Sequence, residues 1–222
     1  MKKVRCFHSH LRLLYNEGNR IFEDIRPLSN GLQALEYAYS RSSSASLTHL
    51  HRIFTSTYGI LFFGTPHLGS AHASTLASLT KMLSLSLPRK ALSPSSTLIS
   101  TLREDSETLQ LINDAFAPLM SRFRIFFLWE QLPTDLKYTW SRIVEESSAA
   151  PMMIGGVERA GIEADHRDMV RFTKAEEAGF RTVVAAIRRY TEDAPRLIAE
   201  RYRLAGEAAE RARMAEAKEL LA

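Results

Sequence analysis

The sequence predicts an α/β protein in which a mostly parallel sheet carries helices on both faces. Two short apolar runs, residues 59–63 and 125–129, each end abruptly at glycine or polar residues. Runs that are apolar throughout, without alternation, are typical of strands buried on both faces. Helical patterns lie between and after these runs, notably over residues 98–116 and 179–190. Strands that alternate with helices favour a parallel sheet.

The segments before the first run are predicted to be helical. Apolar residues recur every three or four positions over residues 3–24, with a break near Gly18, and residues 31–39 form a second helical segment. The serine-rich residues 40–46 are predicted to be a solvated loop.

The later part of the chain adds a weaker strand and a charged helix. A third apolar run covers residues 140–144 and predicts a further strand. Residues 195–222 are rich in Ala, Glu, Arg and Leu, which favour helix, and their apolar positions form only a thin stripe. We therefore expect a domain over residues 1–195 and, over residues 196–222, a helical tail that is either a linker or a helix that docks to a protein partner.

Composition excludes several classes of protein. Of 222 residues, 45% are hydrophobic and 24% charged, which is ordinary for one globular core. Cys6 is the single cysteine, so intramolecular disulfides and cysteine-rich zinc sites are excluded, and we expect an inert thiol in a reducing compartment. The net charge of +4 is dispersed, so no nucleic-acid partner is expected. No apolar run approaches the roughly 20 residues that span a bilayer, which predicts an intracellular, most simply cytoplasmic protein; peripheral membrane association stays open.

Three candidate functional residues follow apolar runs. His67 follows the first run, Glu130 the second and His166 the third. An acid after one strand and a histidine after the next is the arrangement in which α/β-hydrolases complete a triad, because the carboxylate orients a histidine that takes the proton of a serine. Asp135 and Glu145 are rival candidates for the acid.

His67 has a more ordinary interpretation, in which residues 65–67 only shape the loop after the first run and Gly64 relieves backbone strain. His67 and His72 lie five residues apart without a nearby cysteine or carboxylate pair, so we expect neither a metal nor another cofactor.

The stretches GILFFGTPHLGS, RIFFLWEQLP and IEADHRDMVRF carry a family resemblance. Over residues 25–192 the chain resembles the serine-esterase-like α/β-hydrolase domains at the N-terminus of many fungal multidomain proteins, which often precede NACHT or repeat modules and are related to serine-active-site lipases. The resemblance implies a carboxylic ester or lipid acyl hydrolase, with Glu130 as the triad acid and His166 as the triad histidine.

The chain departs from this family at the nucleophile. The family carries its serine in a glycine-rich elbow after a buried strand, but no two of the ten glycines here have the spacing of G-x-S-x-G. Ser29 with Gly31 is half of such an elbow, and a loop or helix N-cap position suits Ser29 better than the role of nucleophile. Compared with this family, the strand, the elbow and the first helical turn look excised after Leu28. The first portion of the fold, with the loop that carries the oxyanion hole, also looks missing.

Two hypotheses follow. The first is an incomplete α/β-hydrolase, impaired because the elbow is missing, with His166 as base, Glu130 as orienting acid and Ser29 as a weak nucleophile. The second is a non-catalytic interaction domain of a larger signalling-type protein. Because a central strand is missing, residues 1–50 are expected to form loosely packed helices, with no strand leading into Ser29.

Overall fold

The computed structural model describes residues 21–40, 48–67, 72–86, 96–136, 139–152 and 155–220, so Cys6, the helix expected before Gly18 and most of the serine-rich loop lie outside the described residues. The elements, in chain order, are α1 (Ile21–Ser40), α2 (Thr48–Ser56), β1 (Gly59–Phe63), α3 (His72–Ser86), α4 (Ser96–Phe116), the 3-10 helix η2 (Ala117–Arg122), β2 (Arg124–Glu130), β3 (Thr134–Asp135), β4 (Trp140–Ser141), α5 (Glu146–Ala149), β5 (Glu158–Ile162) and α6 (Ala178–Leu220).

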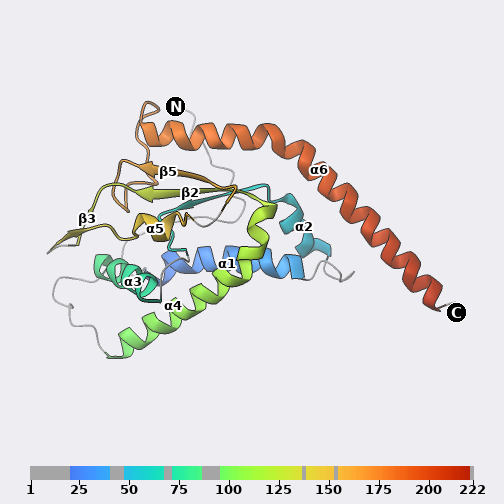
Figure 1. Cartoon of the computed structure of the whole chain (residues 1–222), viewed down its shortest axis with the longest axis horizontal. Helices are drawn as coiled ribbons and strands as arrows, with labels where there is room; N and C mark the ends of the chain where they lie inside the picture. The colour runs from blue at the N-terminus through green and yellow to red at the C-terminus, as the bar shows by residue number, and fades with distance from the viewer. Residues whose placement is uncertain are drawn as a thin grey trace.

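A parallel sheet with the strand order β1-β2-β5 forms the centre of the fold. Phe63 pairs with Leu128 in the β1–β2 register, and Glu130 pairs with Ile162 in the β2–β5 register. Helix α6 lies over one face, and α1 and α4 cover the other (Figure 1). The predicted α/β class, parallel sheet and two helical layers are confirmed at this level.

Successive side chains of β2 enter two separate cores. Ile125 and Phe127 join the core beneath the sheet, which includes Leu32 of α1 and Phe116 of α4. Phe126 and Leu128 point the other way, into a second core that also contains Ile162, Met169, Val183 and Ala186. Both faces of the strand are buried, which explains why its sequence is apolar throughout.

Two expectations about strands need correction. Within residues 140–144 only Trp140 and Ser141 form a strand, β4, and it pairs antiparallel with β3 in a separate two-stranded sheet. The third strand of the main sheet is β5, which the apolar pattern did not reveal. His166 therefore follows β5 and not the run at residues 140–144.

Helix α1 differs from the loosely packed helices expected near the N-terminus. It runs without interruption through Ser29, so no strand leads into this residue, as predicted. Ser29 lies well inside the helix, and the loop or N-cap position is therefore wrong. In the second half of the helix, Leu32, Leu35 and Ala38 are at most 8% exposed, so this part belongs to the packed core.

The C-terminal helix begins before Pro195. Residues 179–190 and 195–220 belong to one helix, α6, which carries Pro195 in its interior. A proline interrupts the hydrogen-bond ladder of a helix and bends it, and Figure 1 shows α6 bending between the part over the sheet and the part that projects beyond it. None of the helices in the described segments is both long and apolar enough to cross a membrane.

Candidate functional site

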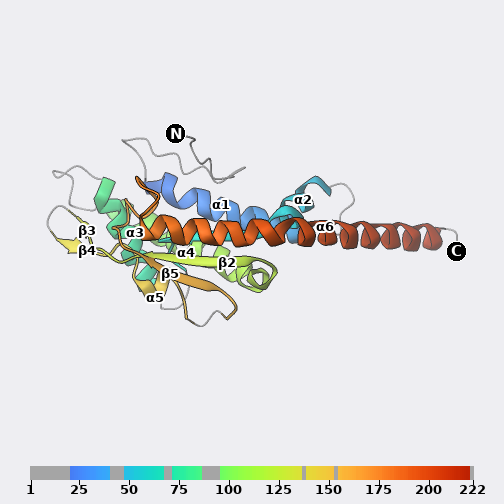
Figure 2. The same cartoon turned by 90° about the horizontal axis from the view of Figure 1, so that it is seen from above.

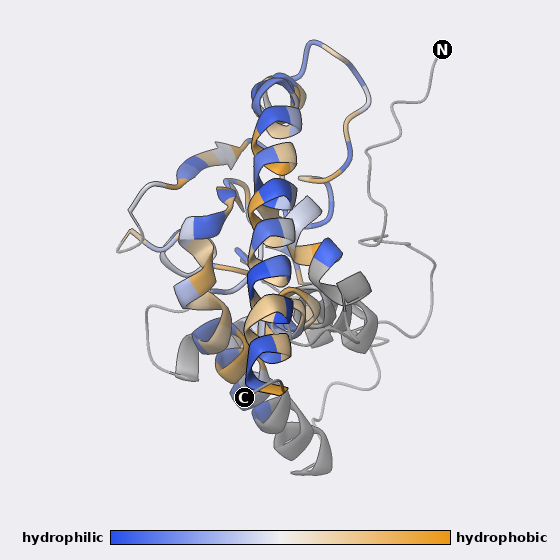
Figure 3. Cartoon of the chain, turned by 90° about the vertical axis from the view of Figure 1, so that its right-hand side faces the viewer, coloured by the Kyte–Doolittle hydropathy of each residue, from blue (hydrophilic) through white to orange (hydrophobic). Residues whose placement is uncertain are grey.

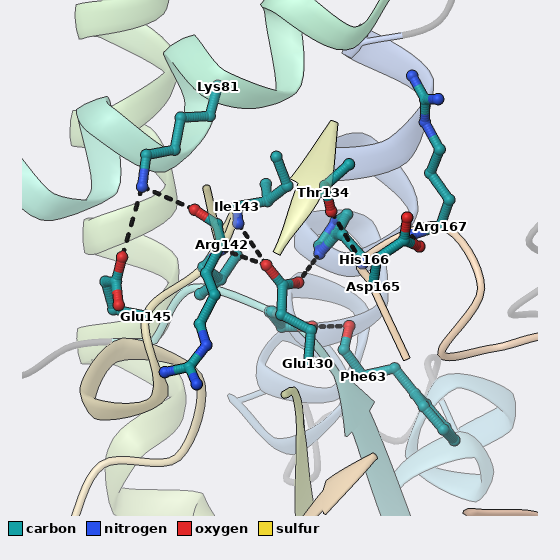
Figure 4. Close-up of polar contacts among 12 residues, drawn as sticks. Phe63, Lys81, Glu130, Thr134, Arg142, Ile143, Glu145, Asp165, His166 and Arg167 are labelled. Atoms are coloured by element: carbon teal, nitrogen blue, oxygen red, sulfur yellow. Dashed lines mark hydrogen bonds and ion pairs between the residues drawn. The ribbon is translucent and has the colours of Figure 1, made fainter. Parts of the chain in front are cut away.

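Glu130 and His166 meet at the carboxyl edge of the parallel sheet. Glu130 is the last residue of β2, and His166 lies in the loop after the neighbouring strand β5. The carboxyl ends of adjacent parallel strands share one edge, which brings the two side chains together. Glu130 Oε2 lies 2.5 Å from His166 Nδ1, and Figure 4 shows the carboxylate pointing at the ring.

The carboxylate of Glu130 is fully buried and fully partnered. Its exposed fraction is 0%, and its second oxygen, Oε1, accepts hydrogen bonds from the backbone N–H groups of Ile143 and Val144. A buried carboxylate without such donors would cost several kcal/mol of stability (about 3 or more). The end of the apolar run at residues 140–144, predicted to be a strand, therefore supplies two backbone N–H donors to Glu130.

The loop after β5 is held so that the ring of His166 reaches across the sheet. The backbone N–H of His166 donates to Thr134 Oγ1 over 3.1 Å, and the carboxylate of Asp165 accepts from the N–H groups of Arg167 and Asp168 at 2.9 and 3.0 Å. Such a turn is a common use of aspartate, whose short side chain bonds to the backbone two and three residues ahead.

Gly64, directly after β1, makes room for this ring. Its φ of +53° lies in the left-handed region that favours glycine. A Cβ at this position would lie 3.0 Å from both Nδ1 and Cε1 of His166 and 2.9 Å from Met169 Sδ. His166 thus extends from the end of β5 over Glu130 to the end of β1.

The pair can act as a general base. A carboxylate only accepts hydrogen bonds, so Nδ1 of His166 donates its proton to Glu130, and Nε2 is left to accept one. About one fifth of the His166 side chain is exposed. Within the described segments no hydrogen bond reaches Nε2, so the pair has no described hydroxyl group to activate.

The structure places the remaining candidates elsewhere. Ser29 lies in the backbone of α1, and its side chain is outside the described residues. Glu145 is exposed and pairs with Lys81 at 3.5 Å, and Asp135 lies exposed on β3. Glu130, and neither rival, is the acid that contacts His166.

His67 is a core residue. Its ring packs edge-on against Phe62 and Phe127, with centroids 4.4 and 4.8 Å away. Burial lowers the pKa of His67 to about 4, and a hydrogen bond with Asn113 opposes this shift only in part. The buried neutral ring and the hydrogen bond from the backbone N–H of His67 to Ser148 O fix the loop after β1, as the structural interpretation predicted.

Sequence reasoning missed the groups around the pair. No sequence pattern marks Thr134 or the backbone N–H groups of Ile143 and Val144. The sequence predicts a role for Gly64 in relieving backbone strain, but not its close approach to His166. Among the described residues, no group of three or more His, Cys, Asp or Glu side chains is arranged to hold a metal ion.

Comparison with family models, with curated proteins and with solved structures found no match to this chain.

Proposed function

We propose that the chain is a serine-hydrolase-type protein, by descent a carboxylic ester or lipid acyl hydrolase, in which His166 and Glu130 are the base and its orienting acid. The observation that carries this proposal is the 2.5 Å contact between Nδ1 of an accessible histidine and a carboxylate that is fully buried and held by two backbone N–H groups. A histidine held in one tautomer by a buried carboxylate is the base unit of serine hydrolases.

The proposed activity is weak, because the chain carries no glycine-rich elbow. An ordinary serine needs a base and an oxyanion hole, and the loss of a single oxyanion donor costs roughly a hundredfold to a thousandfold in rate. We therefore expect slow hydrolysis of activated esters, such as p-nitrophenyl butyrate, that depends on His166.

The test compares two substitutions in one loop. His166→Ala should reduce the rate of ester hydrolysis to the level of buffer, because the imidazole is the base. Asp168→Asn is the matched control, since Asp168 is exposed and pairs only with Arg171 in this loop. Equal rates in the wild type, His166→Ala and Asp168→Asn would contradict the proposal.

A fluorophosphonate probe separates the nucleophile from the base. Labelling that disappears in Ser29→Ala would assign Ser29 as the nucleophile. Labelling that persists in Ser29→Ala but disappears in His166→Ala would assign a different serine. No labelling of a folded wild-type protein would exclude serine catalysis in this chain.

The second candidate is a non-catalytic interaction domain, and the end of α6 favours it. All residues from 206 to 220 are exposed, and this part of the helix projects beyond the rest of the molecule (Figure 2). A helix that is polar all round bridges to a partner or depends on its own side-chain pairs. Sedimentation of the chain with and without residues 206–220 tests whether this segment causes self-association. If both chains sediment as the same oligomeric species, a second copy of the chain is excluded as the partner of this segment.

A further inference from the structure

The structure holds a large open cavity whose lining includes neither Glu130 nor His166. Its volume is about 1520 Å³, and its walls come from η2, the loop before β5, α5 and the middle of α6. One end lies beside Tyr58 and Arg124, at the amino ends of β1 and β2. The strands are parallel, so this end lies at the opposite edge of the sheet from the candidate functional site.

Three arginines line this end, and we call Arg122, Arg124 and Arg201 the arginine cluster; Tyr58 and the charge of Asp193 raise the pKa of Arg124. Arg201 donates from Nη1 to Thr57 O at 2.7 Å and from Nη2 to Arg122 O. Neutral carbonyl oxygens thus fix the guanidinium of Arg201 without cancelling its charge. Burial lowers the pKa of Arg201, and Arg122 adds to this effect while Tyr58 opposes it. No carboxylate contributes to the shift at Arg201, whereas Asp193 acts on Arg124 at the same end of the cavity.

The cavity also has apolar walls. Met120, Trp129 and Val157 line it, and all three pack against the core beneath the sheet. Leu197 of α6 lines it beside the arginine cluster. The two carboxylates of the lining, Glu145 and Glu146, belong to the segment at α5, and Glu145 is paired with Lys81.

We propose that this cavity binds an amphipathic anion, a phosphate or carboxylate group carried on an apolar chain. The arginine cluster would take the anionic group, because guanidinium groups bind phosphate and carboxylate through charge-assisted hydrogen bonds. The apolar chain would lie along Trp129, Val157 and Met120, where it leaves water. The cavity exceeds the roughly 300–1,000 Å³ of most small-molecule sites, which suits an elongated ligand. This proposal is independent of the proposed hydrolase activity.

The test uses decyl phosphate below its micelle concentration, with titration calorimetry as the readout. Trp129 fluorescence in a Trp140→Phe background reports contact with the apolar wall, since Trp129 is then the only tryptophan of the chain. Inorganic phosphate and decyl maltoside test the two halves of the ligand separately. We expect one decyl phosphate per chain, with much weaker binding of either half.

Arg122→Gln and Arg201→Gln should each weaken the binding of decyl phosphate about tenfold, as expected for the loss of one charge-assisted contact. Arg201 also bonds to two backbone carbonyls, so Arg122→Gln is the variant that leaves those bonds in place. The matched control is Arg203→Gln on the same helix, because Arg203 lies outside the lining and pairs with Glu200 and Glu207. Equal binding of decyl maltoside, equal binding of inorganic phosphate, or unchanged affinity in Arg122→Gln and Arg201→Gln would each overturn the proposal.

Discussion

A missing side chain at Gly64 allows His166 to reach Glu130. The ring of His166 passes so close to the end of β1 that a Cβ at Gly64 would lie 3.0 Å from two of its atoms. The backbone there also has a positive φ, which an alanine adopts only with strain. Gly64 is therefore a positioning residue for the candidate base.

Gly64→Ala should lower the free energy of unfolding by about 1–3 kcal/mol and displace the ring of His166. Urea unfolding measures the first effect, and the NMR titration of the imidazole measures the second. Gly206→Ala is the matched control, because nothing lies within 4 Å of a Cβ there and the residue is inside a helix. It should leave the free energy of unfolding unchanged within about 0.5 kcal/mol, because residues 206–220 are exposed and project beyond the packed part of the molecule. If Gly64→Ala leaves the free energy of unfolding unchanged, the loop tolerates a side chain at this position.

His67 makes stability depend on pH. Its pKa is about 4 in the folded protein and near 6.5 in the unfolded chain, so the unfolded state binds more protons between these values. Stability therefore falls as the pH falls from 6.5 towards 4. Between pH 7 and pH 5 the loss from this group is about 2 kcal/mol.

Urea unfolding at both pH values measures this loss. His67→Gln removes the titrating group, so the free energy of unfolding of this variant should change less between pH 7 and pH 5 than that of the wild type. An equal change in both proteins would mean that the ring of His67 is protonated in the folded state at pH 5.

At the scale of elements, burial on both faces determines which strands the sequence reveals. β1 and β2 carry apolar side chains throughout, since each side of β2 meets a core. β5 is an edge strand with polar side chains: Glu158 bonds to Arg189 and Tyr190, and Arg159 donates to Pro151 O. Its side chains find polar partners, so no apolar run marks it.

The candidate site was predictable only in part. The types and order of Glu130 and His166 indicated an acid and a base on neighbouring strands, and their contact follows from the parallel sheet. Ile143 and Val144 are fully buried, as a strand would be, but their backbone N–H groups serve Glu130. An apolar pattern indicates which residues are buried, but it does not indicate what their backbone N–H groups bond to. For this reason the pattern at residues 140–144 predicts a strand.

Helix α6 serves two roles along its length, and truncation separates them. Tyr202 Oη lies 2.7 Å from Ser56 Oγ, and Arg201 donates to Thr57 O, so well beyond Pro195 the helix still contacts the end of α2 and the residue that follows it. A chain that ends after Ala205 should unfold within about 0.5 kcal/mol of the full chain, because residues 206–220, the described part of what it loses, are all exposed.

A chain that ends after Pro195 also loses the contacts of Leu197, Arg201 and Tyr202, and should be less stable by about 1–3 kcal/mol. Urea unfolding of both truncated chains provides the comparison. If the two truncated chains are equally stable, residues 196–205 contribute nothing to stability and the folded domain ends at Pro195.

At the scale of the whole molecule, β2, like β1, joins two cores. Its odd-numbered residues pack against α1 and α4, and its even-numbered residues pack against α6. In Figure 3, by contrast, hydrophilic turns recur along α6 where it extends away from the sheet. Local stability should therefore be highest in β2 and lowest at the end of α6.

Amide hydrogen exchange tests whether the two cores unfold as one unit. The amides of β2 should exchange only through global unfolding, and those of residues 206–220 should exchange with little protection. Val183→Ala removes packing only on the α6 side of the sheet. It should nevertheless speed amide exchange at Phe127 as much as at Phe126, because both residues belong to β2, which pairs with a strand on each side. Faster exchange confined to α6 would show that this helix opens separately and that the core beneath the sheet holds β2 without it.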